Sequence, residues 1–259
     1  MKTKEKRLIK REHSKFVAFF DVLGFESLYN SIGLLEIEKK YNELIEVVNN
    51  LNKEAGMRFA NIGGRSALIA MNIPIEYAYF SDTLLFWVDG SSLTNQDPLI
   101  DLIEEILCKS IEIELPLRGS LNAEETLFDK EKNIYLGQSL ISGARAESAQ
   151  NWIGVTLSNS FFTSGAPFYP DRVLPYNKHI KSGKENFVID FVIDFPKHWR
   201  KTRKTDLKEE IKKLDKQPEF SHYYSNTIEF CEFSKNMENQ NWMNMPIYEK
   251  LLDKYRKNE

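Results

Sequence analysis

FVAFFDVLGF, residues 16–25, predicts the strand around which this chain is built. Residues 16–22 form a short, continuous run of mostly apolar β-formers, which is typical of a strand buried inside a sheet. Asp21 interrupts the run close to its end, and Gly24 follows three residues later. A glycine there permits a tight turn and a close approach of the backbone to a ligand. The stretch therefore predicts a buried strand that carries a carboxylate to one end of the sheet.

Helical and extended patterns alternate along the chain that follows. Two segments repeat apolar residues at helical spacing, and four others are short runs of β-formers. The predicted helices cover residues 34–51 and 98–111, and the predicted strands cover residues 67–75, 77–88, 115–121 and 152–157. The order β-α-β-β-α-β is that of a ferredoxin-like sheet. We therefore expect an α+β fold, with an antiparallel sheet and helices, over residues 16–163.

The ends of the chain differ in composition from this central part. Residues 1–15 are charged throughout and predict a frayed basic arm. Residues 164–259 begin with irregular, proline-rich chain and continue as charged, helical sequence. Within them we expect a strand at 187–195 and helices at 205–215, 222–236 and 246–257. The sequence thus predicts a mostly helical C-terminal extension packed on the core.

Composition excludes several classes of protein. Hydrophobic residues make up 42% of the 259 residues, charged residues make up 28%, and the net charge is −3. This balance is ordinary for a globular protein and gives no general attraction to nucleic acid or to an anionic membrane. No run approaches the roughly 20 apolar residues of a membrane span. Two cysteines far apart, Cys108 and Cys231, predict neither a disulfide framework nor a zinc site, so we expect a cytoplasmic protein.

Two aspartates are candidates for a metal site. Asp21 ends the buried strand, and Asp82 lies within YAYFSDTLLFW, residues 77–87, between two apolar β-runs. Taken singly, each has a structural interpretation, Asp21 as a helix cap and Asp82 as part of a hairpin turn. Taken together, two carboxylates at strand ends suit two-metal phosphoryl or nucleotidyl transfer. Backbone N–H groups of the turn at Leu23, Gly24 and Phe25 could then face phosphates.

A third candidate segment is GQSLISGARAESAQ, residues 137–150, which predicts a short helix rich in small residues. Small side chains allow close contact on one helix face. Arg145 could reach a triphosphate from this helix and stabilise negative charge that develops in a transition state. The alternative is an arginine on the surface of a packed helix.

Three segments, in this order and spacing, resemble the class III adenylate and guanylate cyclases. They are FFDVLGF, FSDTLLF and GARAES, and the resemblance covers residues 14–160. It implies that Asp21, Asp82 and the Val22 carbonyl hold two divalent ions, Mn²⁺ or Mg²⁺. It also implies a homodimer whose active sites lie at the interface, with Arg145 supplied from the second subunit.

The sequence departs from the cyclase pattern chiefly at the positions that recognise the nucleobase. The two positions that read a purine in that family are Ala78 and Ile134 here, and the family's asparagine is Ile141. In this respect the chain resembles the pyrimidine cyclases of bacterial Pycsar antiphage immunity, which make cyclic UMP or cyclic CMP. That likeness implies UTP or CTP as substrate, with UTP slightly favoured, and a separate effector protein that reads the product.

Tyr79 and Arg118 are our candidates for holding a pyrimidine, by stacking and by hydrogen bonds to its carbonyls. The alternative is that Tyr79 is a core aromatic and Arg118 an ion-pair partner. Two other functions stay open, a catalytically silent cyclase-like dimer that senses nucleotides and a purine cyclase that uses ATP or GTP. Neither nucleic acid nor a membrane is expected as a partner.

Overall fold

The computed structural model describes residues 15–61, 74–91, 95–163, 169, 171–184 and 190–256. The basic arm predicted for residues 1–15 lies almost wholly outside these ranges, as does most of the strand predicted at 67–75. Among the described residues, no helix combines the length and the apolar character that a membrane crossing requires.

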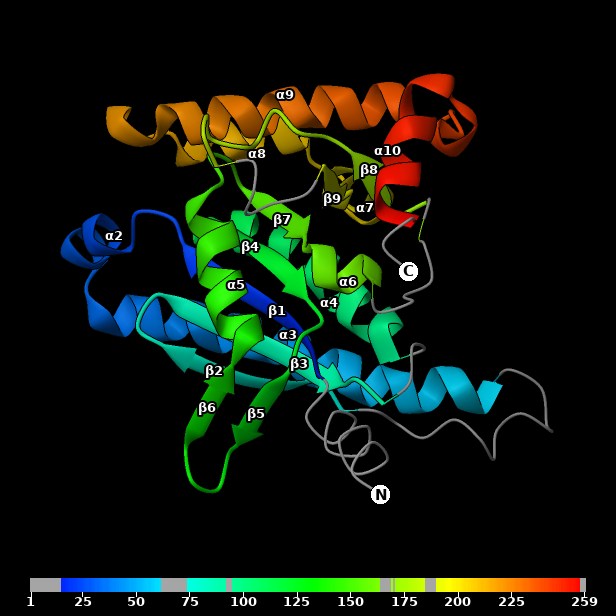
Figure 1. Ribbon diagram of the computed structural model, residues 1–259. Coiled ribbons are helices and arrows are strands. Elements are labelled where there is room, and N and C mark those ends of the chain that lie inside the picture. Colours follow the sequence, from blue (N-terminus) through cyan, green and yellow to red (C-terminus); the bar gives the residue numbers. More distant parts are fainter. Residues whose placement is uncertain are drawn as a thin grey trace, which may run out of the picture.

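A seven-stranded sheet forms the centre of the molecule (Figure 1), in the order β2-β3-β1-β4-β7-β9-β8. Neighbouring strands are antiparallel except for β4 and β7, which are parallel. The strands are β1 (Lys15–Val22), β2 (Glu76–Phe80), β3 (Thr83–Asp89), β4 (Leu117–Asn122), β7 (Gly154–Leu157), β8 (Val173–Pro175) and β9 (Phe191–Ile193). The first four strands, in the order β2-β3-β1-β4, form the predicted ferredoxin-like arrangement. The expected α+β fold is confirmed.

The side chains of β1 point alternately to the two faces of the sheet. Phe16, Ala18 and Phe20 belong to the main core, whereas Val17 and Phe19 belong to a smaller cluster on the opposite face. The main core includes side chains of two long helices, α3 (Leu34–Asn61) and α4 (Gln96–Glu112). The opposite face carries α5 (Gln138–Ser148) and the hairpin of β5 (Thr126–Asp129) and β6 (Ile134–Gly137). In Figure 1 this hairpin reaches away from the sheet.

Most predicted elements form, and the differences have local causes. The strand predicted at 77–88 is a hairpin, because Ser81 adopts a positive φ of 57° and reverses the chain between β2 and β3. Helix α2 (Phe25–Ile32) was not predicted, since its short sequence has no long helical repeat. Of the strand predicted at 187–195, residues 191–193 form β9, but the strand ends earlier than predicted, because Asp194 caps a helix that begins at Phe195. Residues 185–189 lie outside the described ranges.

The C-terminal residues add helices along the edge of the molecule that carries β7, β9 and β8 (Figure 1). The elements are α7 (Phe195–Thr202), α8 (Leu207–Leu214), the 3₁₀ turn η2 (Pro218–Phe220), α9 (Ser221–Met237), the 3₁₀ turn η3 (Trp242–Asn244) and α10 (Pro246–Arg256). A short helix, α6 (Asn159–Thr163), ends the central part of the chain. The predicted helices at 205–215, 222–236 and 246–257 correspond to α8, α9 and α10. Trp152, Trp199 and Trp242 are almost fully buried and join these helices to the sheet.

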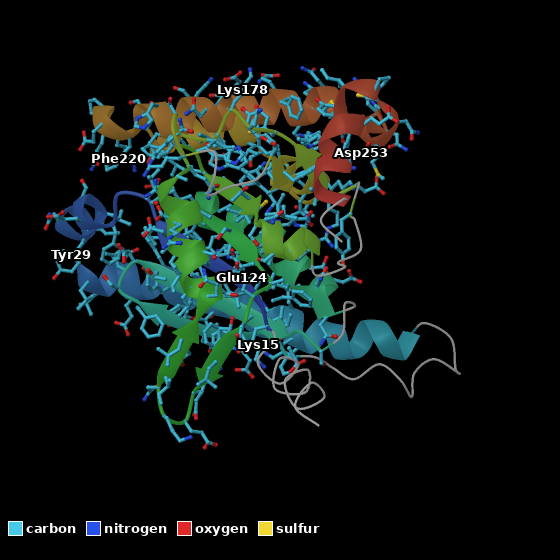
Figure 2. The ribbon with its side chains drawn as sticks, in the orientation of Figure 1. Lys15, Tyr29, Glu124, Lys178, Phe220 and Asp253 are labelled. Carbon is cyan, nitrogen blue, oxygen red and sulfur yellow. The ribbon has the colours of Figure 1, made fainter. Side chains whose placement is uncertain are left out.

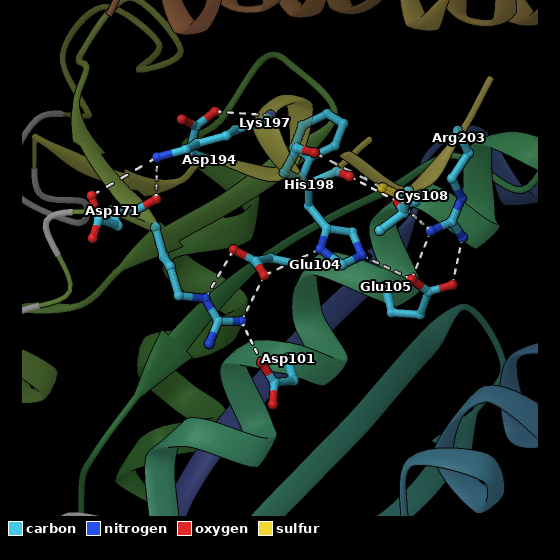
Figure 3. Close-up of polar contacts among 12 residues, drawn as sticks. Asp101, Glu104, Glu105, Cys108, Asp171, Asp194, Lys197, His198 and Arg203 are labelled. Carbon is cyan, nitrogen blue, oxygen red and sulfur yellow. Dashed lines mark hydrogen bonds and ion pairs between the residues drawn. The ribbon is translucent and has the colours of Figure 1, made fainter. Parts of the chain in front are cut away.

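A polar network ties α4 to the C-terminal helices (Figure 3). Glu105 accepts from Arg203 at 2.7 Å and contacts the His198 ring nitrogen at 2.9 Å. The neighbouring Glu104 accepts from the Arg172 Nε at 3.1 Å. Several basic side chains between residues 197 and 204 are therefore paired with carboxylates of the same chain.

Candidate active site

The β2–β3 hairpin brings Asp82 to the same end of the sheet as Asp21. Strands β1 and β3 are antiparallel, and Asp21 lies opposite Thr83. The Val22 N–H donates to the Asp82 carbonyl at 3.0 Å, so the turn is tied to the last residue of β1. Two carboxylates that are 61 positions apart in sequence thus become neighbours through one strand pairing.

A hollow of about 480 Å³ opens where these aspartates meet. Its lining includes Asp21, Asp82 and the first turn of α2. The helix begins after Gly24, which has a φ of +70° and offers no side chain to cap the helix. The first backbone N–H groups of a helix have no partner within it, and they carry partial positive charge. The hollow therefore joins two carboxylates to a group of donors suited to anionic oxygens.

Arg118 of β4 and Glu147 of α5 complete a charged cluster with Asp21. The Arg118 guanidinium lies 3.4 Å from the Asp21 carboxylate and forms an ion pair with Glu147. It also donates to the Gln150 carbonyl at 3.2 Å and to the Tyr223 hydroxyl at 3.4 Å. The cluster is largely buried, with 14% of the Arg118 side chain and 19% of the Asp21 side chain exposed.

Burial raises the pKa of Asp21 to about 7. The charge of Glu147 adds to the rise, Arg118 opposes it, and Asp82 adds a smaller contribution. Burial also raises the pKa of Glu147, against the influence of Arg118. One guanidinium is therefore surrounded by more carboxylates than it can neutralise.

The residues fit a divalent cation. Carboxylate and carbonyl oxygens are the ligands that Mg²⁺ and Mn²⁺ prefer. A cation in the hollow would offset both the lost hydration and the neighbouring negative charge that raise the pKa of Asp21. Across the described ranges there is no cluster of three or more His, Cys, Asp or Glu side chains arranged as ligands. Asp21 and Asp82 would thus act with backbone, water or substrate oxygens.

Arg145 lies apart from this cluster within the chain. Helix α5 packs its small residues on β1, so closely that a Cβ on Gly143 would lie 2.7 Å from the Phe19 Cβ. Glu147 lies on the buried side of the helix, whereas Arg145 is exposed. The α5 side chain that contacts the Asp21 cluster is therefore Glu147.

Tyr79 lines a second hollow of about 440 Å³ beside the first. The two share Phe25, and the second includes Ser81, the residue before Asp82. The Tyr79 ring stacks on Tyr77 with centroids 5.4 Å apart. Its hydroxyl is buried and has no hydrogen-bond partner among the described residues. Tyr79 thus packs as a core aromatic and also borders a cavity.

The remaining sequence candidates occupy different surroundings. Leu23 is buried, and Phe25 packs against the main core at the start of α2. Ala78 is buried on the sheet face that carries the β5–β6 hairpin. Ile134 on β6 and Ile141 on α5 are exposed apolar side chains. Arg118 has the ion-pair role that was the alternative to base recognition.

Sequence analysis missed Glu147 and the aromatic residues of the C-terminal extension. Glu147 could have been found, since Gly143, Ala146 and Glu147 share one helix face at i, i+3 and i+4. A face made of small residues is the face that packs on the sheet. For Phe220 and Tyr223, local sequence carries no such signal.

Comparison with known proteins finds solved structures of low similarity. No family model matches the sequence, and no curated protein sequence matches it. Two structures of a bacterial light-regulated adenylyl cyclase align at 12% identity, with TM-scores of 0.42 and 0.40. They cover 78% and 62% of this chain, which in turn spans 56% and 47%, about half, of theirs. The adenylyl cyclase CyaB from P. aeruginosa aligns at 12% identity and a TM-score of 0.41, over 70% of this chain and 93% of its own.

The raised pKa of Asp21 predicts a pH dependence of stability. Folding raises this pKa from the usual 3.8 to about 7, so between those values the folded chain binds more protons than the unfolded chain. Stability therefore falls as pH rises through this window, and the penalty is complete above it. Asp21→Asn removes the ionisation. We expect its free energy of unfolding, relative to the native sequence, to rise between pH 4 and pH 7 by on the order of 1–3 kcal/mol.

Urea unfolding in EDTA at pH 4, 5.5 and 8 measures this difference. Glu249→Gln is the control, because Glu249 is an exposed carboxylate on α10. The control should show no comparable trend. A stability difference for Asp21→Asn that is constant with pH would contradict the raised pKa.

Proposed function

We propose that this chain is a nucleotidyl cyclase, a phosphorus–oxygen lyase that converts UTP or CTP to the 3′,5′-cyclic monophosphate and pyrophosphate. One observation carries the proposal: Asp21 and Asp82 meet in a hollow that also contains the first turn of α2. Nucleotide cyclisation needs metal-binding carboxylates and donors for phosphate oxygens in the same place. The motif resemblance to class III cyclases concerns these same residues.

In the proposed reaction, the protein's own groups bind and orient the triphosphate. The backbone N–H groups of Gly24 and Phe25, together with the positive end of α2, would bind phosphate oxygens. The Leu23 N–H donates to the Pro116 carbonyl at 2.9 Å and would have to leave that partner to join them. Asp21, Asp82 and the Val22 carbonyl would hold two Mn²⁺ or Mg²⁺ ions. When bound, these ions would activate the 3′-hydroxyl and neutralise charge on the phosphates.

Arg145 would complete the site from a second copy of the chain. Its exposed position on α5 leaves the guanidinium accessible to a partner. The surface around it supports a homodimer, since Leu127 and Leu136 on the hairpin and Ile141 on α5 are 43%, 59% and 48% exposed. Exposed apolar side chains grouped in this way mark interaction surfaces. An arginine at the developing phosphate charge would stabilise the transition state.

The second hollow supports a pyrimidine as the base. Tyr79 borders it and keeps a buried hydroxyl without a partner among the described residues, which a base carbonyl or amino group could satisfy. Ala78 faces the other side of the sheet, toward the β5–β6 hairpin, so the position that reads a purine in the cyclase family gives this hollow no polar atom. Leaving a purine edge unpaired costs roughly 1–3 kcal/mol for each group. Arg118 lies on the α5 side of the sheet with Glu147, whereas Tyr79 packs toward Tyr41 of α3. The guanidinium would therefore have to leave its present partners to donate to a carbonyl of the same base. UTP is slightly favoured, because uracil presents two carbonyl acceptors.

A nucleotide-sensing dimer without turnover is the second candidate. The Arg118 guanidinium lies 3.4 Å from the Asp21 carboxylate and competes with a cation for it. The exposed Ile141 replaces the family's asparagine. A purine cyclase is the third candidate, and base competition distinguishes it. If the pyrimidine assignment holds, the resemblance further suggests a second messenger for antiphage defence that a separate effector protein reads.

Activity should require both aspartates. Asp21→Ala and Asp82→Ala each remove a carboxylate from the hollow, and we expect turnover to fall by about 10²-fold or more. The measurement is product formation from the four ribonucleoside triphosphates with Mn²⁺, separated by chromatography. Asp171→Ala is the control, because this side chain is 94% exposed. Full activity in either aspartate variant would exclude the two-metal assignment.

Mixed dimers test whether the site is shared between subunits. Asp21→Ala and Arg145→Ala should each be inactive alone, for different reasons. In a mixed dimer one of the two sites contains native Asp21 and native Arg145, so activity should return to about a quarter of the native level in an equal statistical mixture. Subunit exchange is checked by native mass spectrometry. Proven exchange without recovered activity would place the whole site within one chain.

Base selectivity is tested by competition. Equimolar ATP, GTP, CTP and UTP are incubated with the protein and Mn²⁺, and the cyclic products are quantified. We expect cyclic UMP or cyclic CMP to exceed the purine products by about tenfold or more. A purine cyclic nucleotide as the main product would overturn the pyrimidine assignment and leave the cyclase assignment in place.

A further inference from the structure

The C-terminal extension borders the candidate active site. Residues of η2, Glu219 and Phe220, line the same hollow as Asp21 and Asp82. About 200 positions of sequence separate Phe220 from Asp21. Figure 2 shows Phe220 at the end of α9 that lies on the same side of the molecule as α2.

Phe220 packs directly on the turn that precedes α2. A Cβ on Gly24 would lie 2.9 Å from one carbon of the Phe220 ring and 3.1 Å from another. This contact, together with the positive φ of +70°, is why only glycine fits the turn. The ring therefore packs on a turn that itself lines the hollow.

Two further contacts attach the segment of residues 217–223 to the site. The Gln217 side chain donates to the Ser27 hydroxyl on α2. The Arg118 guanidinium carbon lies 5.4 Å from the centre of the Tyr223 ring, and the guanidinium donates to the Tyr223 hydroxyl at 3.4 Å. Through Arg118, Tyr223 is one contact away from Asp21.

Helix α9 holds this segment in place from its other side. The Thr227 hydroxyl accepts from the Ile153 N–H at 2.8 Å, and the Phe230 ring packs on Trp152 with centroids 4.7 Å apart. Both partners lie immediately before β7, which begins at Gly154. The position of Phe220 therefore depends on the docking of α9 against the sheet.

We propose that residues 217–223 are a wall of the nucleotide site and that Phe220 contacts the bound nucleoside triphosphate. The inference rests on the proposed function and adds a substrate contact from outside the cyclase-like part of the chain. Phe220 excludes water from the side of the hollow next to the Gly24 turn, and Tyr223 positions Arg118. Binding of the triphosphate reduces the motion of this segment.

Hydrogen–deuterium exchange of the full chain tests the wall directly. Each of the four ribonucleoside triphosphates is added with Mn²⁺, and exchange is followed in peptides covering residues 19–28 and 217–224. We expect slower exchange in both peptides with the triphosphate that binds. Protection of residues 19–28 alone would show that residues 217–223 do not border the bound nucleotide, and it would leave the proposed function standing. Protection of neither peptide by any triphosphate would overturn both.

A matched pair of substitutions tests Phe220 itself. Phe220 and Phe233 are both half-buried residues packed on the main core, but Phe233 borders a different hollow, near Tyr176. We expect Phe220→Ala to raise KM for the triphosphate by about tenfold, with kcat changed by less than about threefold, and Phe233→Ala to leave KM unchanged.

Phe220→Leu and Phe233→Leu, which keep most of the buried volume, are measured in parallel in case an alanine variant does not fold. Phe220→Leu should raise KM by a smaller factor than Phe220→Ala. Equal KM values for the folded members of the two pairs would show that Phe220 does not contact the substrate.

Discussion

Burying the Asp21 carboxylate is the constraint on which the site depends. Strand β1 is almost fully buried on both faces, and a charged group at its end loses hydration that must be replaced. Arg118, on the adjacent strand, supplies the opposite charge, and Glu147 approaches from α5. Breaking such a buried pair by removing one partner is typically costly, because the other charge is left uncompensated. The arrangement of β4 and α5 around β1 therefore has an electrostatic as well as an apolar component.

The same constraint favours cation chemistry at this place. Three carboxylates, from Asp21, Asp82 and Glu147, act on one another's charge, and a single guanidinium does not balance them. A metal ion would have to compete with Arg118 for the Asp21 carboxylate, so the Arg118–Asp21 ion pair weakens metal binding. A cyclase in which nucleotide and metal bind together could overcome this competition, because the phosphates bring ligands of their own. A nucleotide sensor would use the same hollow to bind the nucleotide without binding a metal ion.

Helix α9 shows how the C-terminal extension is integrated with the sheet. Its middle part packs on Trp152, its first turn contacts Arg118, and the η2 turn before it covers Gly24. These contacts come from consecutive residues of η2 and α9, so a change in the docking of α9 would affect the Gly24 turn and the Asp21 cluster together. The extension is thus positioned to influence the site while the ferredoxin-like sheet supplies its carboxylates.

Much of this could be predicted from local sequence, because strands and helices with strong periodicity depend mainly on neighbouring residues. The β1 strand, α3, α4, α5 and the last three helices were found in this way, and so were the two aspartates at one end of the sheet. The β2–β3 hairpin was only an alternative interpretation, since its turn depends on a positive φ at Ser81.

The partners of Asp21 could not be read from sequence. Arg118 is 97 positions from Asp21 and 105 from Tyr223, and side-chain contacts act over a few ångströms only. Strand pairing and the docking of α9 decide which distant groups come within that reach, so only the tertiary structure determined how the buried charge is balanced.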